Sequence, residues 1–155
     1  MAFEDLASDF LAQKRIAVAG LSRTEQATGN AIYKALRNKG YTVFAVHPGA
    51  DVIEGDTCYR TLKAIPDGVD GVFVVTRPEV SAQVMHDAVE AGVPRVWMHY
   101  NALFGAKTSS VSKEAVAYGR EHGVTVIDGG CPMMFFDVGH KCMRWILGRM
   151  GKLPN

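Results

Sequence analysis

The sequence has few cysteines, and their arrangement points to no cysteine-based scaffold. Only three occur among its 155 residues, at Cys58, Cys131 and Cys142, and no two of them have C-x-x-C spacing. An odd number without that spacing argues against a disulfide framework and against a structural zinc site. A metal site built from Cys131, His140 and Cys142 would have poor ligand spacing, so no metal ligand is assigned.

Long apolar runs and a strong net charge are also missing. No apolar run approaches the roughly 18 residues that a membrane span requires, and the first residues, MAFEDL, are acidic where a signal peptide would be basic. The net charge of +1 provides neither a broad basic surface for nucleic acid nor an acidic tail. We therefore expect a soluble cytoplasmic protein that binds neither membranes nor nucleic acid.

Length and composition favour one domain over residues 1–155. A domain of this size buries about 70% of the surface that its unfolded chain exposes. Hydrophobic residues make up 48% of the sequence, which is enough for a core without the help of a metal or disulfide. No internal repeat or low-complexity tract interrupts the chain.

Short apolar runs alternate with helical patterns along the chain. Strands are expected at 15–20, 41–46, 71–76, 95–98 and 124–127, and most are continuously apolar, as buried parallel strands are. Helical stripes lie between them and stop at Gly40, Gly92 and Gly123. This alternation predicts right-handed βαβ crossovers, and therefore an α/β fold with a doubly wound, Rossmann-like parallel sheet.

Three segments depart from the alternation. An amphipathic helix over residues 3–12 is expected to pack on the sheet. An irregular unit at Asp51–Tyr59 replaces the second crossover helix, and residues 62–66 predict a single helical turn. A helix over residues 137–150 carries an apolar stripe, which we interpret as a docking surface and not as a membrane-surface helix, because the helix is short and weakly charged.

The apolar surface near the C-terminus predicts self-association. The stripe of the last helix and the segment before it offer more apolar surface than one small sheet easily covers. The residues concerned are Met133, Met134, Phe135, Phe136, Val138, Cys142, Trp145 and Ile146. A symmetric homodimer is the commonest way to cover such a surface.

The most informative stretch is residues 15–23, where an apolar strand enters a Gly/Ser turn that leads through Thr28-Gly29-Asn30 into a helix. Gly20 lets the backbone turn sharply and approach a ligand closely, and Ser22 offers a hydroxyl. The helix that follows would present unpaired N–H groups and the positive end of its dipole to an anion. This strand-turn-helix predicts a phosphate site for a nucleotide-type ligand.

Further candidates follow the other strands, because the ligand crevice of an open parallel sheet lies beyond the carboxyl ends of its strands. The full set of candidate ligand-binding residues is Gly20, Leu21, Ser22, Arg23, Asn30, His47, Pro48, Thr76, Arg77, Pro78, Met98 and Cys131. Arg23 and Arg77 are the leading phosphate ligands, because a guanidinium makes forked, charge-assisted contacts to phosphate oxygens. His99 follows a strand as well and has the same two interpretations as His47, a ligand contact or a hydrogen bond to a loop carbonyl.

Each candidate also has a purely structural interpretation. Ser22 is alternatively a turn or cap hydroxyl, and the two arginines are alternatively solvated surface charges. Cys131 follows a Gly-Gly pair after the last strand, where its thiol either faces the cleft or is a small buried packing residue. No nucleophile, base and oxyanion donor occur together, so no catalytic residue is assigned.

An ordered series of segments extends from about Lys14 to Pro132. It comprises VAGLS at 18–22, GYxV at 40–43, VxP at 46–48, GDxxYxxLxxIP at 55–66, VD at 69–70, VW at 96–97 and GVxVIDxxCP at 123–132. The series resembles the small stand-alone CoA-binding proteins, which are similar to the CoA-binding N-terminal domain of the succinyl-CoA synthetase α subunit. The resemblance implies a non-catalytic module that binds coenzyme A or an acyl-CoA, with the pyrophosphate over residues 20–22 and the adenosine near residues 46–48 and 76–78.

The chain departs from the family pattern at a few positions. Ala27 stands where the family usually has an arginine, His47 where it usually has an asparagine, and His99-Tyr100 roughly where it has Gln-Gly. Arg23 offers a replacement for the missing charge. The alternative to a CoA module is an NAD(H)-binding redox sensor or small Rossmann-type enzyme, although the sequence lacks G-x-G-x-x-G and an acid after the second strand.

Overall fold

The computed structural model describes residues 2–24, 27–102, 109–136 and 145–151. Its centre is a seven-stranded sheet of order β3-β4-β2-β1-β5-β6-β7. The strands are β1 Arg15–Ala19, β2 Thr42–Val46, β3 Val52–Ile53, β4 Asp56–Tyr59, β5 Gly71–Val74, β6 Arg95–Met98 and β7 Thr125–Asp128. All neighbouring strands are parallel except β3 and β4. The predicted α/β fold is confirmed.

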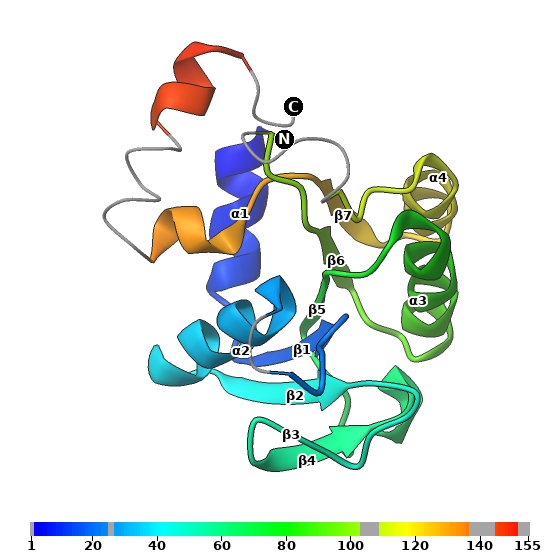
Figure 1. Ribbon diagram of the computed structural model, residues 1–155. Helices are drawn as coiled ribbons and strands as arrows, with labels where there is room; N and C mark the ends of the chain where they lie inside the picture. Colours follow the sequence, from blue (N-terminus) through cyan, green and yellow to red (C-terminus); the bar gives the residue numbers. More distant parts are fainter. Residues whose placement is uncertain (1, 25–26, 103–108, 137–144, 152–155) are drawn as a thin grey trace.

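Helices cover both faces of the sheet (Figure 1). They are α1 Phe3–Leu11, α2 Thr28–Asn38, α3 Pro78–Glu90 and α4 Lys113–Glu121, with 3-10 turns η1 Leu62–Ala64 and η3 Pro132–Phe135. Ile16 and Val18 of β1 join the apolar core with α1 and α2. The alternate residues, Ala17 and Ala19, join a second core with α3 and α4. This alternation along a buried strand explains why the predicted strand was continuously apolar.

The unit at 51–59 is a β-hairpin, so the prediction of an irregular segment was wrong. β3 and β4 pair in an antiparallel manner, and β4 continues the sheet beside β2. The connecting residues, Glu54 and Gly55, both have left-handed backbones, with φ of 54° and 78°. Such hairpin turns usually contain Asn-Gly or Asp-Gly, and the two strands are only two and four residues long. The usual sequence signals of a hairpin were therefore missing.

The helix α1 occupies the place of the helix predicted over residues 3–12. Its Phe10 ring lies 4.6 Å from the Phe73 ring and 5.5 Å from the Trp97 ring, centroid to centroid. The Arg95 guanidinium donates to the Asp9 carboxylate at 2.7 Å. Aromatic packing and a half-exposed ion pair thus hold α1 against the sheet.

The predicted C-terminal helix is described only in part, because residues 137–144, with Val138, His140 and Cys142, lie outside the described residues. Residues 145–149 are helical. Trp145 and Ile146 face solvent, with exposed fractions of 62% and 41%, while Leu147 is buried. The homodimer stays a prediction. Within the described ranges, no helix is both long and apolar enough to cross a membrane.

Candidate functional site

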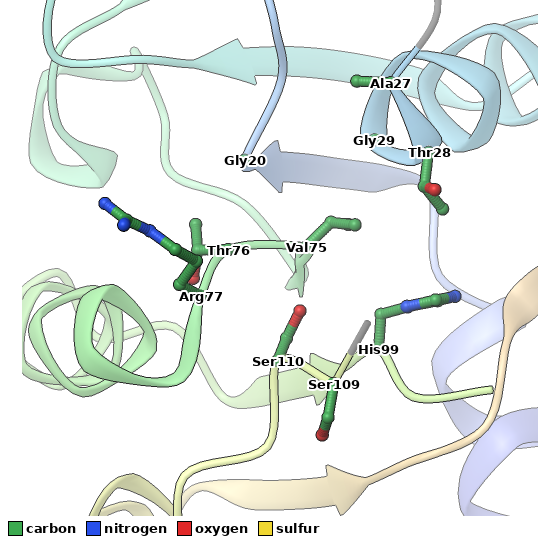
Figure 2. Close-up of a pocket in the computed structure, with 10 residues that line it drawn as sticks. All are labelled: Gly20, Ala27, Thr28, Gly29, Val75, Thr76, Arg77, His99, Ser109 and Ser110. Atoms are coloured by element: carbon green, nitrogen blue, oxygen red, sulfur yellow. The ribbon is translucent and has the colours of Figure 1, made fainter. Parts of the chain in front are cut away.

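A pocket of about 230 Å³ opens at the carboxyl edge of the sheet, between the segments that follow β1, β5 and β6 (Figure 2). Its walls are formed by Gly20, Ala27, Thr28, Gly29, Val75, Thr76, Arg77, His99, Ser109 and Ser110. The neighbouring strands β1 and β5 lead to helices on opposite faces of the sheet. The pocket therefore lies at a topological switch point, where ligands bind in open α/β sheets.

Two glycines allow the segments around the pocket to approach one another. Gly20 has φ of 102°, and a Cβ there would lie 2.4 Å from the backbone of Val75. A Cβ on Gly29 would lie 2.6 Å from the carbonyl oxygen of Gly20. The two residues thus provide the tight turn and the close helix–strand packing for which G-x-G-x-x-G is used elsewhere. Here the glycines are nine positions apart, so the short motif is absent from the sequence.

Helices α2 and α3 both begin at the pocket without a side-chain cap. Their N-cap residues, Ala27 and Arg77, have no side-chain hydrogen-bond acceptor, and the first turn of α2 contains no acidic residue. In contrast, the Ser112 hydroxyl accepts the Ala115 N–H of α4 at 3.2 Å. The first N–H groups of a helix have no partner within it, and they carry the positive end of the dipole. The start of α2 is therefore suited to an anion, whereas α3 begins with Pro78, which has no N–H, and has Glu79 in its first turn.

The turn after β1 is fixed by its own polar groups. The Ser22 N–H donates to Asn30 Oδ1 at 2.8 Å, and the Ser22 hydroxyl accepts the Thr24 N–H at 3.1 Å. Asn30 is 1% exposed and Leu21 is 4% exposed. Ser22 thus has the contacts of a turn hydroxyl, while its role toward a ligand stays a prediction.

Arg23 lies over the loop that follows β2. Its guanidinium donates to the Gly49 carbonyl at 2.5 Å, and the Gly49 N–H donates to His47 Nδ1 at 2.9 Å. A neutral His47 ring consequently carries its proton on Nε2. The structure therefore brings Arg23 together with His47-Pro48-Gly49, while Arg77 lines the pocket at the start of α3.

Thr76 and Pro78 flank Arg77 at the beginning of α3. The Thr76 hydroxyl lies 2.8 Å from the Ser81 hydroxyl, which donates to the Arg77 carbonyl. Pro78 occupies the first turn, where its lack of an N–H costs nothing. These contacts fix the direction in which α3 leaves the pocket.

Of the twelve candidate residues, three line the pocket: Gly20, Thr76 and Arg77. The other nine do not, and Met98 and Cys131 are among those that are buried. Met98 is fully buried in the core beneath α3 and α4. Cys131 is 4% exposed and packs with Met134 and Leu147. Burial raises the pKa of the Cys131 thiol to about 11, which keeps the thiol protonated and poorly nucleophilic at neutral pH. These observations favour the packing interpretation of Cys131.

Several pocket residues were missed in the sequence. Thr28 and Gly29 were placed at the start of the predicted anion-binding helix but not among the ligand-binding residues, and Ser109 and Ser110 were not noticed. In Figure 2 the two serines lie across the pocket from Gly20 and Gly29. The Ser110 N–H donates to the His99 carbonyl at 2.8 Å. This contact between residues eleven positions apart brings the two serines to the pocket. The only sequence signal was a serine pair shortly before a helix.

Comparison with known protein families gives one match over most of the chain. The family described as "CoA binding domain" matches residues 14–137. A Bacillus subtilis relative, the uncharacterized protein YneT, is 33% identical over 118 residues, which cover 76% of this chain and 82% of that protein.

A second relative and a solved structure agree with this match. Acetate–CoA ligase (ADP-forming) I of Archaeoglobus fulgidus is 33% identical over 127 residues, but these cover 76% of this chain and only 18% of the ligase. A hypothetical protein from Pyrococcus horikoshii OT3 has a solved structure that superposes with a TM-score of 0.75 at 27% identity. That superposition covers 86% of this chain and 88% of the other.

Proposed function

The chain belongs to the CoA binding domain family, and from this membership we propose that it binds coenzyme A or an acyl-CoA at the pocket between β1 and β5. The observation that carries the proposal is the N-terminus of α2, whose N-cap side chain accepts no hydrogen bond, together with Arg77 in the wall of the same pocket. Coenzyme A is a polyanion, and such helix ends stabilise phosphate groups. The module has no catalytic role of its own.

The pyrophosphate is assigned to the start of α2. Ala27 and Gly29 have minimal side chains there, so phosphate oxygens can reach the backbone N–H groups of the first turn. The first turn of α2 has no acid to oppose the ligand's charge. Arg77 provides a second positive charge in the wall of the pocket.

The adenosine part and its 3′-phosphate are assigned to the region beyond β2. This strand ends at Val46 and is followed by His47-Pro48, so no carboxylate meets the ribose. A dinucleotide-binding domain would need an acid at this position, whereas a 3′-phosphate would be repelled by one. Arg23, held over the same loop by Gly49, provides the positive charge that a phosphate requires.

The matched ligase suggests where such a module acts. Only 18% of that acetate–CoA ligase corresponds to this chain, so the similarity covers a small part of the ligase. We propose that the domain described here sequesters or presents the cofactor. We further propose that it works in the cytoplasm as a homodimer.

Isothermal titration of the whole chain with CoA, acetyl-CoA, NAD and NADH tests the proposal. We expect saturable binding of CoA or acetyl-CoA, with much weaker binding of both nicotinamide dinucleotides. Tight NADH binding without any CoA binding would overturn the proposal in favour of a Rossmann-type redox sensor or enzyme.

A further inference from the structure

Asn30 is a buried amide that joins the turn after β1 to the β3–β4 hairpin. It is 1% exposed. Its Oδ1 accepts the Ser22 N–H at 2.8 Å, and its Nδ2 donates to the Ser22 carbonyl at 2.9 Å and to the Glu54 carboxylate at 2.8 Å. One side chain at the start of α2 therefore contacts two segments that are 32 positions apart in sequence.

Glu54 and the Ser22 backbone both favour the same orientation of the Asn30 amide. An ionised carboxylate only accepts hydrogen bonds, so the amide must turn its NH₂ group toward Glu54. The amide oxygen then faces the Ser22 N–H. The Glu54 side chain is only 6% exposed, with Lys34 Nζ 4.0 Å away, so few water molecules can replace the Asn30 contact.

Glu54 is itself held in an uncommon conformation. Its φ of 54° lies in the left-handed region, which non-glycine residues adopt only when their surroundings enforce it. Arg37 of α2 donates to the Glu54 carbonyl at 2.9 Å and to the Asp56 carboxylate at 2.8 Å. Tyr33 also donates to Asp56, at 2.7 Å. The same side of α2 that carries Asn30 thus fastens the hairpin at three successive turns.

We propose that Asn30 and Glu54 are positioning residues for the ligand site. Glu54 orients the Asn30 amide, and the amide fixes the Ser22 turn in the shape that leaves the start of α2 open to the ligand. The Ser22 N–H is then engaged by Asn30 and is not a phosphate donor, while the N–H groups of the first α2 turn take that role. This inference rests on the proposed binding of coenzyme A.

Four variants test the inference, and two of them form a matched pair. E54A and E54Q both remove the charge of Glu54, but only glutamine keeps an oxygen that can accept from Asn30. We expect E54A, which loses one buried hydrogen bond, to bind CoA about tenfold more weakly than the wild type. N30A loses three hydrogen bonds and should bind at least as weakly as E54A. E54Q should bind several-fold more tightly than E54A. D9A, which breaks the distant Arg95–Asp9 ion pair, is the control for lost stability.

Titration calorimetry with CoA is carried out on each variant under conditions in which all are folded. Urea unfolding then measures the stability of each variant. Positioning predicts that E54A and N30A lose affinity, that E54Q regains it, and that D9A loses stability without losing affinity. Should N30A fail to fold, the comparison of E54A with E54Q still tests the inference. If the wild type binds CoA and E54A binds as tightly as E54Q, the inference is wrong. If the wild type binds no CoA, the proposed function itself fails.

Discussion

A Cβ atom on Gly29 would lie 2.6 Å from the carbonyl oxygen of Gly20, so only glycine permits α2 to begin this close to the turn after β1. That oxygen is a backbone atom, so it cannot move aside as the end of a flexible side chain could. The close approach of helix and turn, on which the proposed anion site depends, is therefore possible only because Gly29 has no Cβ atom.

Gly29→Ala should consequently disturb both stability and binding. The added methyl group forces α2 away from the turn, and overpacking of this kind costs about 1–3 kcal/mol of unfolding free energy. Urea unfolding and CoA titration measure the two effects. A Gly29→Ala variant with wild-type stability and wild-type affinity would show that the close approach is not required.

Arg23→Ala should weaken the binding of CoA more than the binding of dephospho-CoA, because only CoA carries the 3′-phosphate that we place near Arg23. We expect the difference to be about tenfold, or ~1.4 kcal/mol. Arg60→Ala is a matched control, since Arg60 is an exposed arginine that donates to the Pro48 carbonyl of the same loop. Equal losses for both ligands in Arg23→Ala would move Arg23 to the pyrophosphate or to the surface.

Cys131 should stay unmodified in the folded protein. Burial raises the pKa of its thiol to about 11, so little thiolate exists at neutral pH, and the sulfur is shielded as well. Intact-mass spectrometry with peptide mapping after oxidation in the presence of CoA should find no adduct at Cys131 until the chain is unfolded. A native CoA adduct at Cys131 that dithiothreitol reverses would instead place the thiol in the cleft.

Stability should fall in acid partly through Asp56. Hydrogen bonds from Tyr33 and then from Arg37 hold the pKa of the Asp56 carboxyl below its ordinary value. A carboxyl with a lowered folded-state pKa stabilises the protein above its unfolded-state pKa, and this contribution disappears as pH falls through the folded-state pKa. Asp56→Asn should therefore be less stable than the wild type at neutral pH, and this difference in unfolding free energy should narrow as pH falls below the ordinary pKa of an aspartate, about 3.9. If urea unfolding shows the same difference in stability at neutral and acidic pH, Asp56 does not contribute to the acid sensitivity.

Most of the sheet could be predicted because each long strand is apolar on both faces. Ile16 and Val18 face one helical layer while Ala17 and Ala19 face the other, and that double burial is visible as an unbroken apolar run. The hairpin could not be predicted in this way. Glu54 adopts a left-handed conformation, which a glutamate in the sequence does not predict. The hydrogen bond to its carbonyl comes from Arg37, 17 positions away.

The pocket wall could be predicted in part where it depends on the chain shortly after a strand. Gly20 follows β1 directly, Thr76 and Arg77 are the second and third residues after β5, and all three line the pocket. Ser109 and Ser110 reach it through a backbone hydrogen bond to His99, which no local pattern encodes. The engagement of Ser22 by Asn30 was equally invisible, because an asparagine in the first turn of a helix gives no sign of which segment its amide contacts.

The most direct test of the account is an amide-resolved NMR titration of the ¹⁵N-labelled chain with CoA. We predict that the largest shifts occur at the first turn of α2, around Gly29, and at the start of α3, around Arg77. A separate groove beside α4, lined by Lys113 and Arg120, serves as an internal reference and should change little. Saturable CoA binding with shifts confined to that groove, or no shifts at any amide, would contradict the central claim.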